Sequence, residues 1–139
     1  MPYLKALPLP TQLNAPFWAG LRQHEFRVPR CLNCGDFNWI PYPACRTCLS
    51  ENQEWVTASG TAEVFSYSVV RQSFGAFSGD VPYVVVLAKL TEEPRPCIVT
   101  ANLIGIDPEA IKVGLPIQVV YEDLPEEDLT VFRFSPADA

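Results

Sequence analysis

Four of the chain's five cysteines stand in two C-x-x-C pairs, and ten residues separate the pairs. The first pair is Cys31 and Cys34, and the second is Cys45 and Cys48. In a reducing compartment such pairs bind a metal more often than they form disulfides. Together they offer four thiolates to one ion, which is typical of structural zinc and leaves no coordination position for substrate or water. The sequence therefore predicts a structural zinc site with these four cysteines as ligands.

The spacing alone does not identify the metal. The same four-sulfur geometry also suits iron in a site of rubredoxin type, and free or redox-active thiols are a further alternative. Gly35 directly follows the first pair, at a point where the tight turn of a metal knuckle often needs a positive φ. Zinc is the expected cofactor, and the choice between zinc and iron stays open at this point.

The 139-residue chain has the size of one domain or of two small modules. Hydrophobic residues make up 48% and charged residues 19%, a globular balance, while 14 prolines favour short elements divided by turns. These features predict a mainly β fold. The N-terminus lacks a basic start with an unbroken apolar run, and no stretch approaches about 20 apolar residues. We therefore expect a cytoplasmic chain with no membrane partner.

A short amphipathic helix is predicted before the first cysteine pair. Asn14 is a candidate N-cap and Pro16 suits the first turn. Phe17, Trp18 and Leu21 recur with helical spacing and share one face. We expect the helix to continue far enough to include His24.

The rest of the chain predicts five strands. Residues 64–70 alternate as a half-buried strand does, after a bend at Gly60, and the aromatics Phe65 and Tyr67 are expected in the core. Further strand segments lie at 82–90, 97–105, 116–124 and 129–134, with a charged turn at 91–96. Between the third and fourth strands, Asp107 and Gly114 bound a helix of one or two turns. This order predicts a five-stranded OB-fold barrel.

The expected organisation is an N-terminal helical segment over residues 1–30, a zinc ribbon over 31–54 and the OB-fold barrel over 55–139. Zinc ribbons and OB barrels both occur in nucleic-acid binding, so that class is an alternative. A phosphate-binding surface needs clustered Lys and Arg. The chain instead has ten basic residues against sixteen acidic ones, a net charge of −6, and an acidic stretch at 122–129. The sequence therefore argues against a nucleic-acid partner.

Residues outside the cysteine pairs offer no active site. His24 is the one histidine, and no nucleophile stands beside it in the sequence. Cys97 opens an apolar strand, where a buried and inert thiol is the usual outcome. The chain also lacks G-x-S-x-G, a Gly-rich phosphate loop and H-E-x-x-H. We expect no catalytic residues.

Nearly the whole chain resembles OB-fold proteins with a rubredoxin-like zinc ribbon, the family called domain of unknown function 35. The resemblance rests on the aromatic helix before the first cysteine pair, the step Pro41-Tyr42-Pro43 into the second, and the later Trp55, Gly60 and Pro82-Tyr83. It extends through "VGLPIQVVYED" to the terminal "FRF". Ala62 stands where many relatives have a second glycine.

The resemblance implies a subunit without an active site of its own that pairs with a protein of the thiolase superfamily. It implies acyl-CoA chemistry, with the acyl-CoA bound mainly by the partner. The most specific expectation is a steroid side-chain aldolase, which cleaves a steroid acyl-CoA by a retro-aldol reaction. A β-ketothiolase or acyltransferase complex is the alternative.

A partner surface, or a substrate entrance, is expected in the segment 71–82. Phe74 and Phe77 lie there among serines and glycines, with no strand or helix period to bury them. Large apolar side chains on a loop usually mean that another surface covers them. Alternatively, both rings fold back and cap the open end of the barrel. The helix face of Phe17, Trp18 and Leu21 is a second candidate surface.

Overall fold

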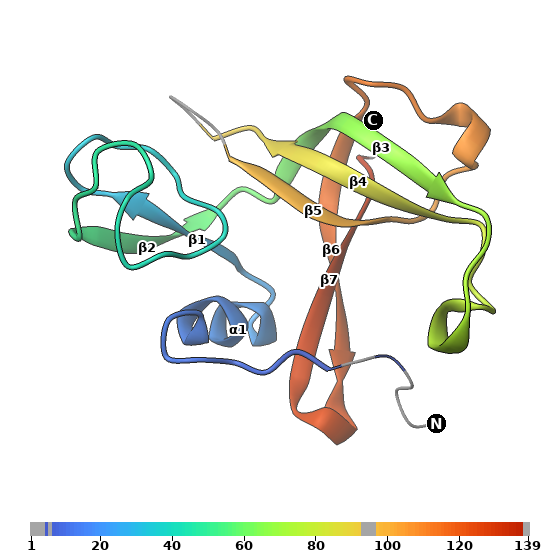
Figure 1. Ribbon diagram of the computed structural model, residues 1–139, viewed down its shortest axis with the longest axis horizontal. Coiled ribbons are helices and arrows are strands. Elements are labelled where there is room, and N and C mark those ends of the chain that lie inside the picture. Colours follow the sequence, from blue (N-terminus) through green and yellow to red (C-terminus); the bar gives the residue numbers. More distant parts are fainter. Residues whose placement is uncertain (1–4, 6, 93–96, 138–139) are drawn as a thin grey trace.

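The computed structural model describes residue 5 and residues 7–92 and 97–137. The helix α1 (Ala15–Arg22) precedes a two-stranded ribbon of β1 (Phe26–Cys31) and β2 (Gln53–Ala58). Five strands follow: β3 (Thr61–Val70), β4 (Tyr83–Leu90), β5 (Ile98–Leu103), β6 (Pro116–Leu124) and β7 (Leu129–Pro136). Three short 3₁₀ turns, η1 (Gly75–Phe77), η2 (Pro108–Ala110) and η3 (Pro125–Glu127), lie in the connections. Figure 1 shows the ribbon on one side of the molecule and η1 on the other.

The five strands form a closed barrel in the order β3-β4-β5-β7-β6, which confirms the predicted OB fold. On β4 every second residue is buried, so one face of the strand lines the barrel interior. Two weak seams complete the closure. β3 meets β6 only over Thr61–Glu63, and β5 meets β7 through the single parallel pair Leu103 and Phe134.

The ribbon passes into the barrel at Gly60, as expected. Gly60 has a φ of +82°, and a Cβ there would lie 2.7 Å from Val119 Cγ1 on β6. A glycine is therefore required at this bend. The predicted domain boundary between residues 54 and 55 falls within β2, which pairs with β1 as far as Ala58. The predicted turn at 91–96 lies largely outside the described residues.

The expected burial of Phe65 and Tyr67 was wrong. Val64 pairs with Ala88 and Ser66 with Leu87, so Phe65 is the extra residue of a β-bulge. Phe65 is 49% exposed and Tyr67 is 38% exposed. The outer half of β3 continues past the closed part of the barrel, where the Tyr67 hydroxyl donates a hydrogen bond to a backbone carbonyl at 3.2 Å.

Both predicted helices are shorter than expected. α1 ends at Arg22, because the N–H groups of His24 and Glu25 bond to the Leu21 and Gly20 carbonyls, both at 2.9 Å. His24 has a φ of +58° in this Schellman ending, so it lies beyond the helix. The second helix is only the 3₁₀ turn η2, although Asp107 caps it as predicted by accepting from the Glu109 N–H.

An aromatic cluster joins the helix, the ribbon and the barrel. At its centre Phe26 of β1 is 1% exposed and contacts four rings, with centroids 5.0–6.5 Å away: Phe17, Trp39, Phe132 and Phe134. The same packing buries the apolar face of α1, leaving Phe17 at 3% and Leu21 at 0% exposure. Phe17 and Leu21 therefore belong to the chain's own core, whereas Trp18, the third residue of the predicted second partner surface, is only partly buried.

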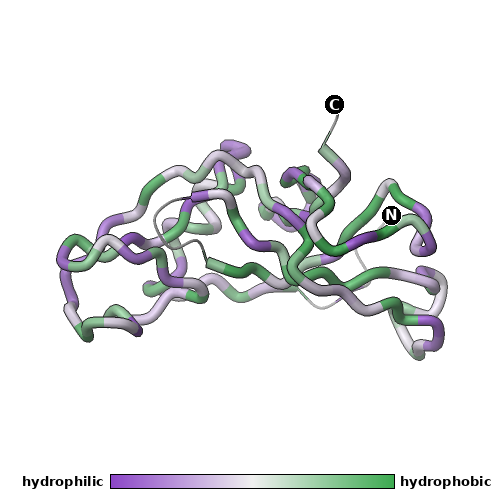
Figure 2. The backbone as a smooth tube through the Cα atoms, turned by 90° about the horizontal axis from the view of Figure 1, so that it is seen from above, coloured by the Kyte–Doolittle hydropathy of each residue, from purple (hydrophilic) through white to green (hydrophobic). Residues whose placement is uncertain are grey.

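In Figure 2, hydrophilic and hydrophobic residues are interspersed along the coloured part of the tube. Within the described residues, no helix has the length and apolar character needed to cross a membrane.

Replacing Phe26 by Ala should destabilise ribbon and barrel together by about 3–5 kcal/mol, because the cavity would open where four rings meet. Phe65→Ala is the matched control, since this ring is half exposed, and it should cost less than about 1 kcal/mol. Chemical unfolding of both variants measures the difference. Equal losses of stability would contradict a core centred on Phe26.

Candidate functional site

The four predicted ligands come together at the outer end of the ribbon. Their sulfur atoms lie within 4.8 Å of one another, with Cys31 Sγ 3.5 Å from Cys48 Sγ and Cys34 Sγ 3.6 Å from Cys45 Sγ. A zinc ion with four thiolates at about 2.3 Å needs sulfur separations of about 3.8 Å. Among the described residues, no other group of three or more His, Cys, Asp or Glu is placed to hold a metal. The four sulfurs fit a structural zinc site.

The two knuckles are built by the same backbone turn. The Gly35 N–H bonds to the Cys31 carbonyl at 3.0 Å, and the Leu49 N–H bonds to the Cys45 carbonyl at 2.9 Å. Gly35 has the predicted positive φ, +83°. Sequence reasoning missed that Leu49 takes the equivalent position with a φ of +66°, because leucine rarely adopts this conformation.

Hydrogen-bond donors of the turns face the sulfurs. The Asn33 N–H points to Cys31 Sγ and the Thr47 N–H to Cys45 Sγ, both at 3.4 Å. The Asn33 side-chain amide donates to Cys48 Sγ at 3.4 Å. Such donors stabilise the negative charge that a metal-bound thiolate carries.

The cysteines differ in pKa for physical reasons. Burial opposes ionisation of Cys45, but the N–H groups of Cys48 and Thr47 outweigh it and lower its pKa to about 6. The Asn33 amide is the main cause that lowers the pKa of Cys48. The Asp36 N–H favours the Cys34 thiolate, yet burial and the neighbouring sulfurs raise its pKa to about 12. Four thiolates this close need a cation between them.

Asn38 supports the site and was missed from the sequence. This side chain is 1% exposed. Its Oδ1 accepts from the Arg46 N–H of the second knuckle at 3.2 Å, and its Nδ2 donates to Gln53 Oε1 of β2 at 3.3 Å. The Gln53 amide in turn donates to the Tyr42 carbonyl at 2.9 Å. The only available signal was an asparagine between two aromatics, Phe37 and Trp39.

His24 and Cys97 lie apart from the sulfur cluster. His24 stacks on Tyr121 at 4.8 Å, and its Nε2 lies 3.1 and 3.2 Å from the two Asp123 oxygens. Thr130 also donates to Asp123 at 2.7 Å, and these contacts, Thr130 first, lower the pKa of Asp123. Cys97 is 4% exposed, and burial raises the pKa of its thiol to about 11. His24 therefore links two parts of the fold, and Cys97 is a neutral core thiol.

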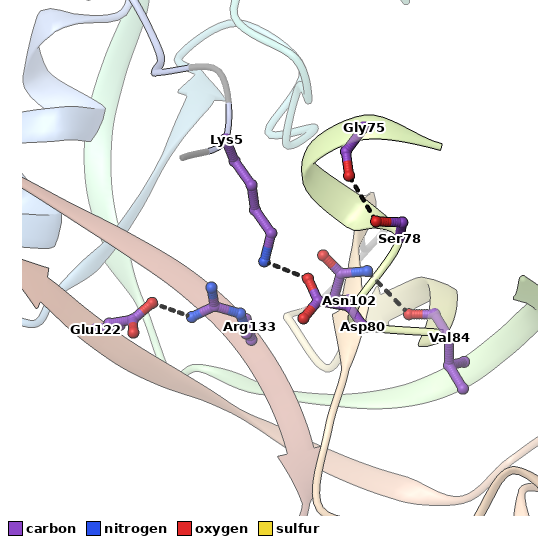
Figure 3. Close-up of polar contacts among 8 residues, drawn as sticks. All are labelled: Lys5, Gly75, Ser78, Asp80, Val84, Asn102, Glu122 and Arg133. Atoms are coloured by element: carbon purple, nitrogen blue, oxygen red, sulfur yellow. Dashed lines mark hydrogen bonds and ion pairs between the residues drawn. The ribbon is translucent and has the colours of Figure 1, made fainter. Parts of the chain in front are cut away.

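The two phenylalanines of the 71–82 segment have different environments. Phe77 lies 5.6 Å from the Tyr83 ring and has Lys5 Nζ 5.1 Å above it, while Lys5 also pairs with Asp80 at 2.7 Å. Figure 3 shows this ion pair beside the turn closed by Ser78 and Gly75. Phe74 is 82% exposed. The base of the segment is thus fixed to the chain itself, and its tip projects.

A cavity of about 340 Å³ lies next to this segment, lined among others by Lys5, Asp80, Asn102 and Arg133. Arg133 Nη1 lies 2.7 Å from Glu122 Oε1, and Asn102 donates to the Val84 carbonyl at 3.1 Å. Both cations of the lining are already paired with carboxylates (Figure 3). The cavity therefore has no excess of positive charge for a phosphate.

Two family models match the chain. The rubredoxin-like zinc ribbon domain of ChsH2 covers residues 18–54, and the C-terminal OB-fold domain of ChsH2 covers residues 55–122. A solved structure described as the Ltp2–ChsH2(DUF35) aldolase superposes with a TM-score of 0.80 at 31% identity. That match covers 94% of this chain and 98% of the other. The chain belongs to the DUF35 family, in which a ChsH2-type zinc ribbon precedes an OB-fold domain.

Two curated relatives are longer proteins. A probable enoyl-CoA hydratase alpha subunit of Thermomonospora curvata is 36% identical over 94% of this chain. The 3-oxo-4,17-pregnadiene-20-carboxyl-CoA hydratase alpha subunit of Mycobacterium tuberculosis is 32% identical over 88% of it. This chain spans only 40% and 38% of the length of these two relatives.

Replacing Cys48 by Ser should release the metal and disorder the ribbon, since metal binding and local folding are one equilibrium in such modules. Cys97→Ser is the matched control, because Cys97 lies outside the sulfur cluster. Elemental analysis should find about one zinc per chain in the wild type and the control, and none in the Cys48 variant. Full zinc in the Cys48 variant, or iron in the wild type, would contradict the assignment.

Proposed function

We propose that the chain is a non-catalytic accessory subunit of an acyl-CoA enzyme whose catalytic subunit belongs to the thiolase superfamily. The observation that carries the proposal is the match to the Ltp2–ChsH2(DUF35) aldolase, which extends over 98% of that chain at 31% identity. In this proposal Cys31, Cys34, Cys45 and Cys48 hold a structural zinc, and the partner binds the acyl-CoA. A cytoplasmic location fits, because reducing conditions keep the four thiols available for the metal.

The most specific form of the proposal is retro-aldol cleavage of a steroid acyl-CoA by the complex. The aldolase described for the matching structure supports the reaction class, and the pregnadiene-carboxyl-CoA relative supports a steroid substrate. A subunit of a β-ketothiolase or acyltransferase complex is the alternative within acyl-CoA chemistry. A nucleic-acid role is disfavoured by the net charge of −6.

A second candidate is an accessory subunit of an acyl-CoA hydratase. It is favoured by the two relatives called hydratase alpha subunits, one of them 36% identical to this chain. The two candidates differ in the catalytic subunit that the chain binds. Copurification of the tagged chain from its native cells, followed by identification of the bound protein, separates them. We expect to recover a thiolase-superfamily subunit. A hydratase subunit would favour the second candidate, and recovery of neither kind of subunit would refute both candidates.

Phe74 is the proposed anchor of the partner contact. Its ring is 82% exposed at the tip of a segment whose base is held by Lys5, Asp80 and Tyr83. Leaving such a ring in water is unfavourable, and a partner pocket that buried it would stabilise the complex. Phe77, at 36% exposure, is proposed as a secondary contact beside it.

Phe74→Ala should weaken binding of the catalytic subunit by about tenfold or more, because buried aromatic anchors commonly cost about 2 kcal/mol when truncated. Phe74→Ala combined with Phe77→Ala should weaken it further. Zinc content and thermal unfolding should change little for the single variant. Lost folding stability with retained affinity would mean that the segment only caps its own barrel.

His24→Ala and Cys97→Ala should each change the turnover of the reconstituted complex by less than about tenfold, because loss of a true base or nucleophile costs far more. Steady-state turnover with saturating subunit concentrations measures this. A loss of about a thousandfold with the complex intact would assign catalysis to this chain.

A further inference from the structure

Among the described residues, no strand pairs with the second edge of the outer half of β3, from Ser66 to Val70. Backbone hydrogen bonds across this edge stop at Val64, whose carbonyl accepts from the Gly114 N–H at 2.7 Å and whose N–H bonds to the Leu115 carbonyl at 3.0 Å. From Ser66 to Val70, the described residues show β3 pairing with β4 alone. The segment around η2 lies beside this half of β3. There the Tyr67 hydroxyl donates to the Ile111 carbonyl, and Arg71 Nη2 donates to Glu109 Oε1.

This edge has neither charge nor proline to block it, and in the described part of the chain the η2 segment beside it makes polar side-chain contacts through Tyr67 and Arg71. Free strand edges invite pairing with another chain, and proteins commonly block them with charges or proline. The ribbon strand β1 is an example of a strand with such residues, because it contains Arg27, Pro29 and Arg30. The stretch Phe65–Val70 has neither charge nor proline, and four consecutive residues, Phe65 to Ser68, are exposed. An open, uncharged edge of this kind is suited to accept a strand.

We infer that an uncharged, extended segment of the catalytic subunit pairs with the free edge of β3. This inference rests on the proposed function, and it specifies how the partner is held. Unpaired backbone N–H and C=O groups are complemented by another peptide backbone, which defines the chemistry of the occupant. Phe74 lies in the connection between β3 and β4, so the proposed edge contact and the proposed anchor belong to the same hairpin.

Charge decides between this occupant and a second copy of the chain. Each copy carries a net charge of −6, so two copies brought together would repel one another. The edge itself offers no ion pair to offset that repulsion, because residues 65–70 are uncharged. A partner that lacks this net negative charge, and that pairs through an uncharged extended segment, avoids this cost.

The test compares variants that carry a single lysine at the β3 edge with a control variant that carries a single lysine on the same face of the sheet but away from that edge. Ser66 pairs with Leu87, and Leu87 pairs with Thr100 on β5, so Ser66 and Thr100 lie on one face two strands apart. Both are exposed. Ser66→Lys and, independently, Ser68→Lys are the edge variants, and Thr100→Lys is the matched control. Equal zinc content and equal unfolding temperature verify that each variant is folded.

The probe is the catalytic subunit recovered and identified by copurification with the wild-type chain. Each edge variant should bind it about tenfold more weakly or worse, whereas Thr100→Lys should stay within about twofold of the wild type. In the wild-type complex, backbone amide exchange within residues 66–70 should slow by about tenfold or more relative to the free chain.

Unchanged affinity of both edge variants would overturn the inference and leave the proposed function intact. An equal loss in Thr100→Lys would also overturn it, because the sheet face rather than the edge would then be in contact. A wild-type chain that dimerises by itself and becomes monomeric in Ser66→Lys would assign the edge to a second copy. If the wild type recovers no acyl-CoA enzyme subunit, the proposed function fails and the inference fails with it.

Discussion

Packing of aromatic rings around Phe26 is the interaction on which the rest of the structure depends. A two-stranded ribbon is marginal by itself, and among the described residues the sheet of β1 and β2 gains only the isolated bridge between Arg30 and Phe37. The ribbon is therefore stabilised at both ends. At its outer end four sulfur atoms are placed for a metal, and at its inner end Phe26 packs against α1 and against β7 of the barrel. Helix, ribbon and barrel consequently share one hydrophobic core.

This shared core holds the helix, the ribbon and the barrel together as one body, which suits the chain to bind and support a partner. Polar contacts at the periphery add to it, since His24 stacks on Tyr121 of β6 and pairs with Asp123. The ribbon and the β3–β4 hairpin then point away from opposite sides of one body (Figure 1). Four cysteines are placed to fill a tetrahedral metal site, and the remaining thiol is a neutral core residue. The hairpin carries the exposed rings of Phe65, Tyr67, Phe74 and Phe77. These features suit a role in assembly better than a role in chemistry.

Much of the fold could be predicted because its signals are local. Paired cysteines, alternating strands, the bend at Gly60 and the cap at Asp107 each depend on a few neighbouring residues. The helix sequence also showed which face is apolar, but not whether the chain or a partner covers it. Phe17 and Leu21 are buried because β1, the next element, and β7, at the far end of the sequence, pack against α1. Tertiary packing of this kind is invisible to local patterns.

The remaining differences have the same origin. The bulge at Phe65 arises from the register with β4, and the support that Asn38 gives to the second knuckle arises from the fold of the ribbon. Leu49 adopts a positive φ because the metal knuckle needs that turn, against the preference of leucine. In each case a long-range requirement overrides a local preference.

The central claim is that this chain supports a catalytic subunit without supplying catalytic groups. The most direct measurement is acyl-CoA turnover by the zinc-loaded chain alone, by its copurified catalytic subunit alone, and by the two together. We predict no turnover by the chain alone and full turnover only by the pair. Turnover by the chain alone, or equal turnover by the catalytic subunit without it, would contradict this account.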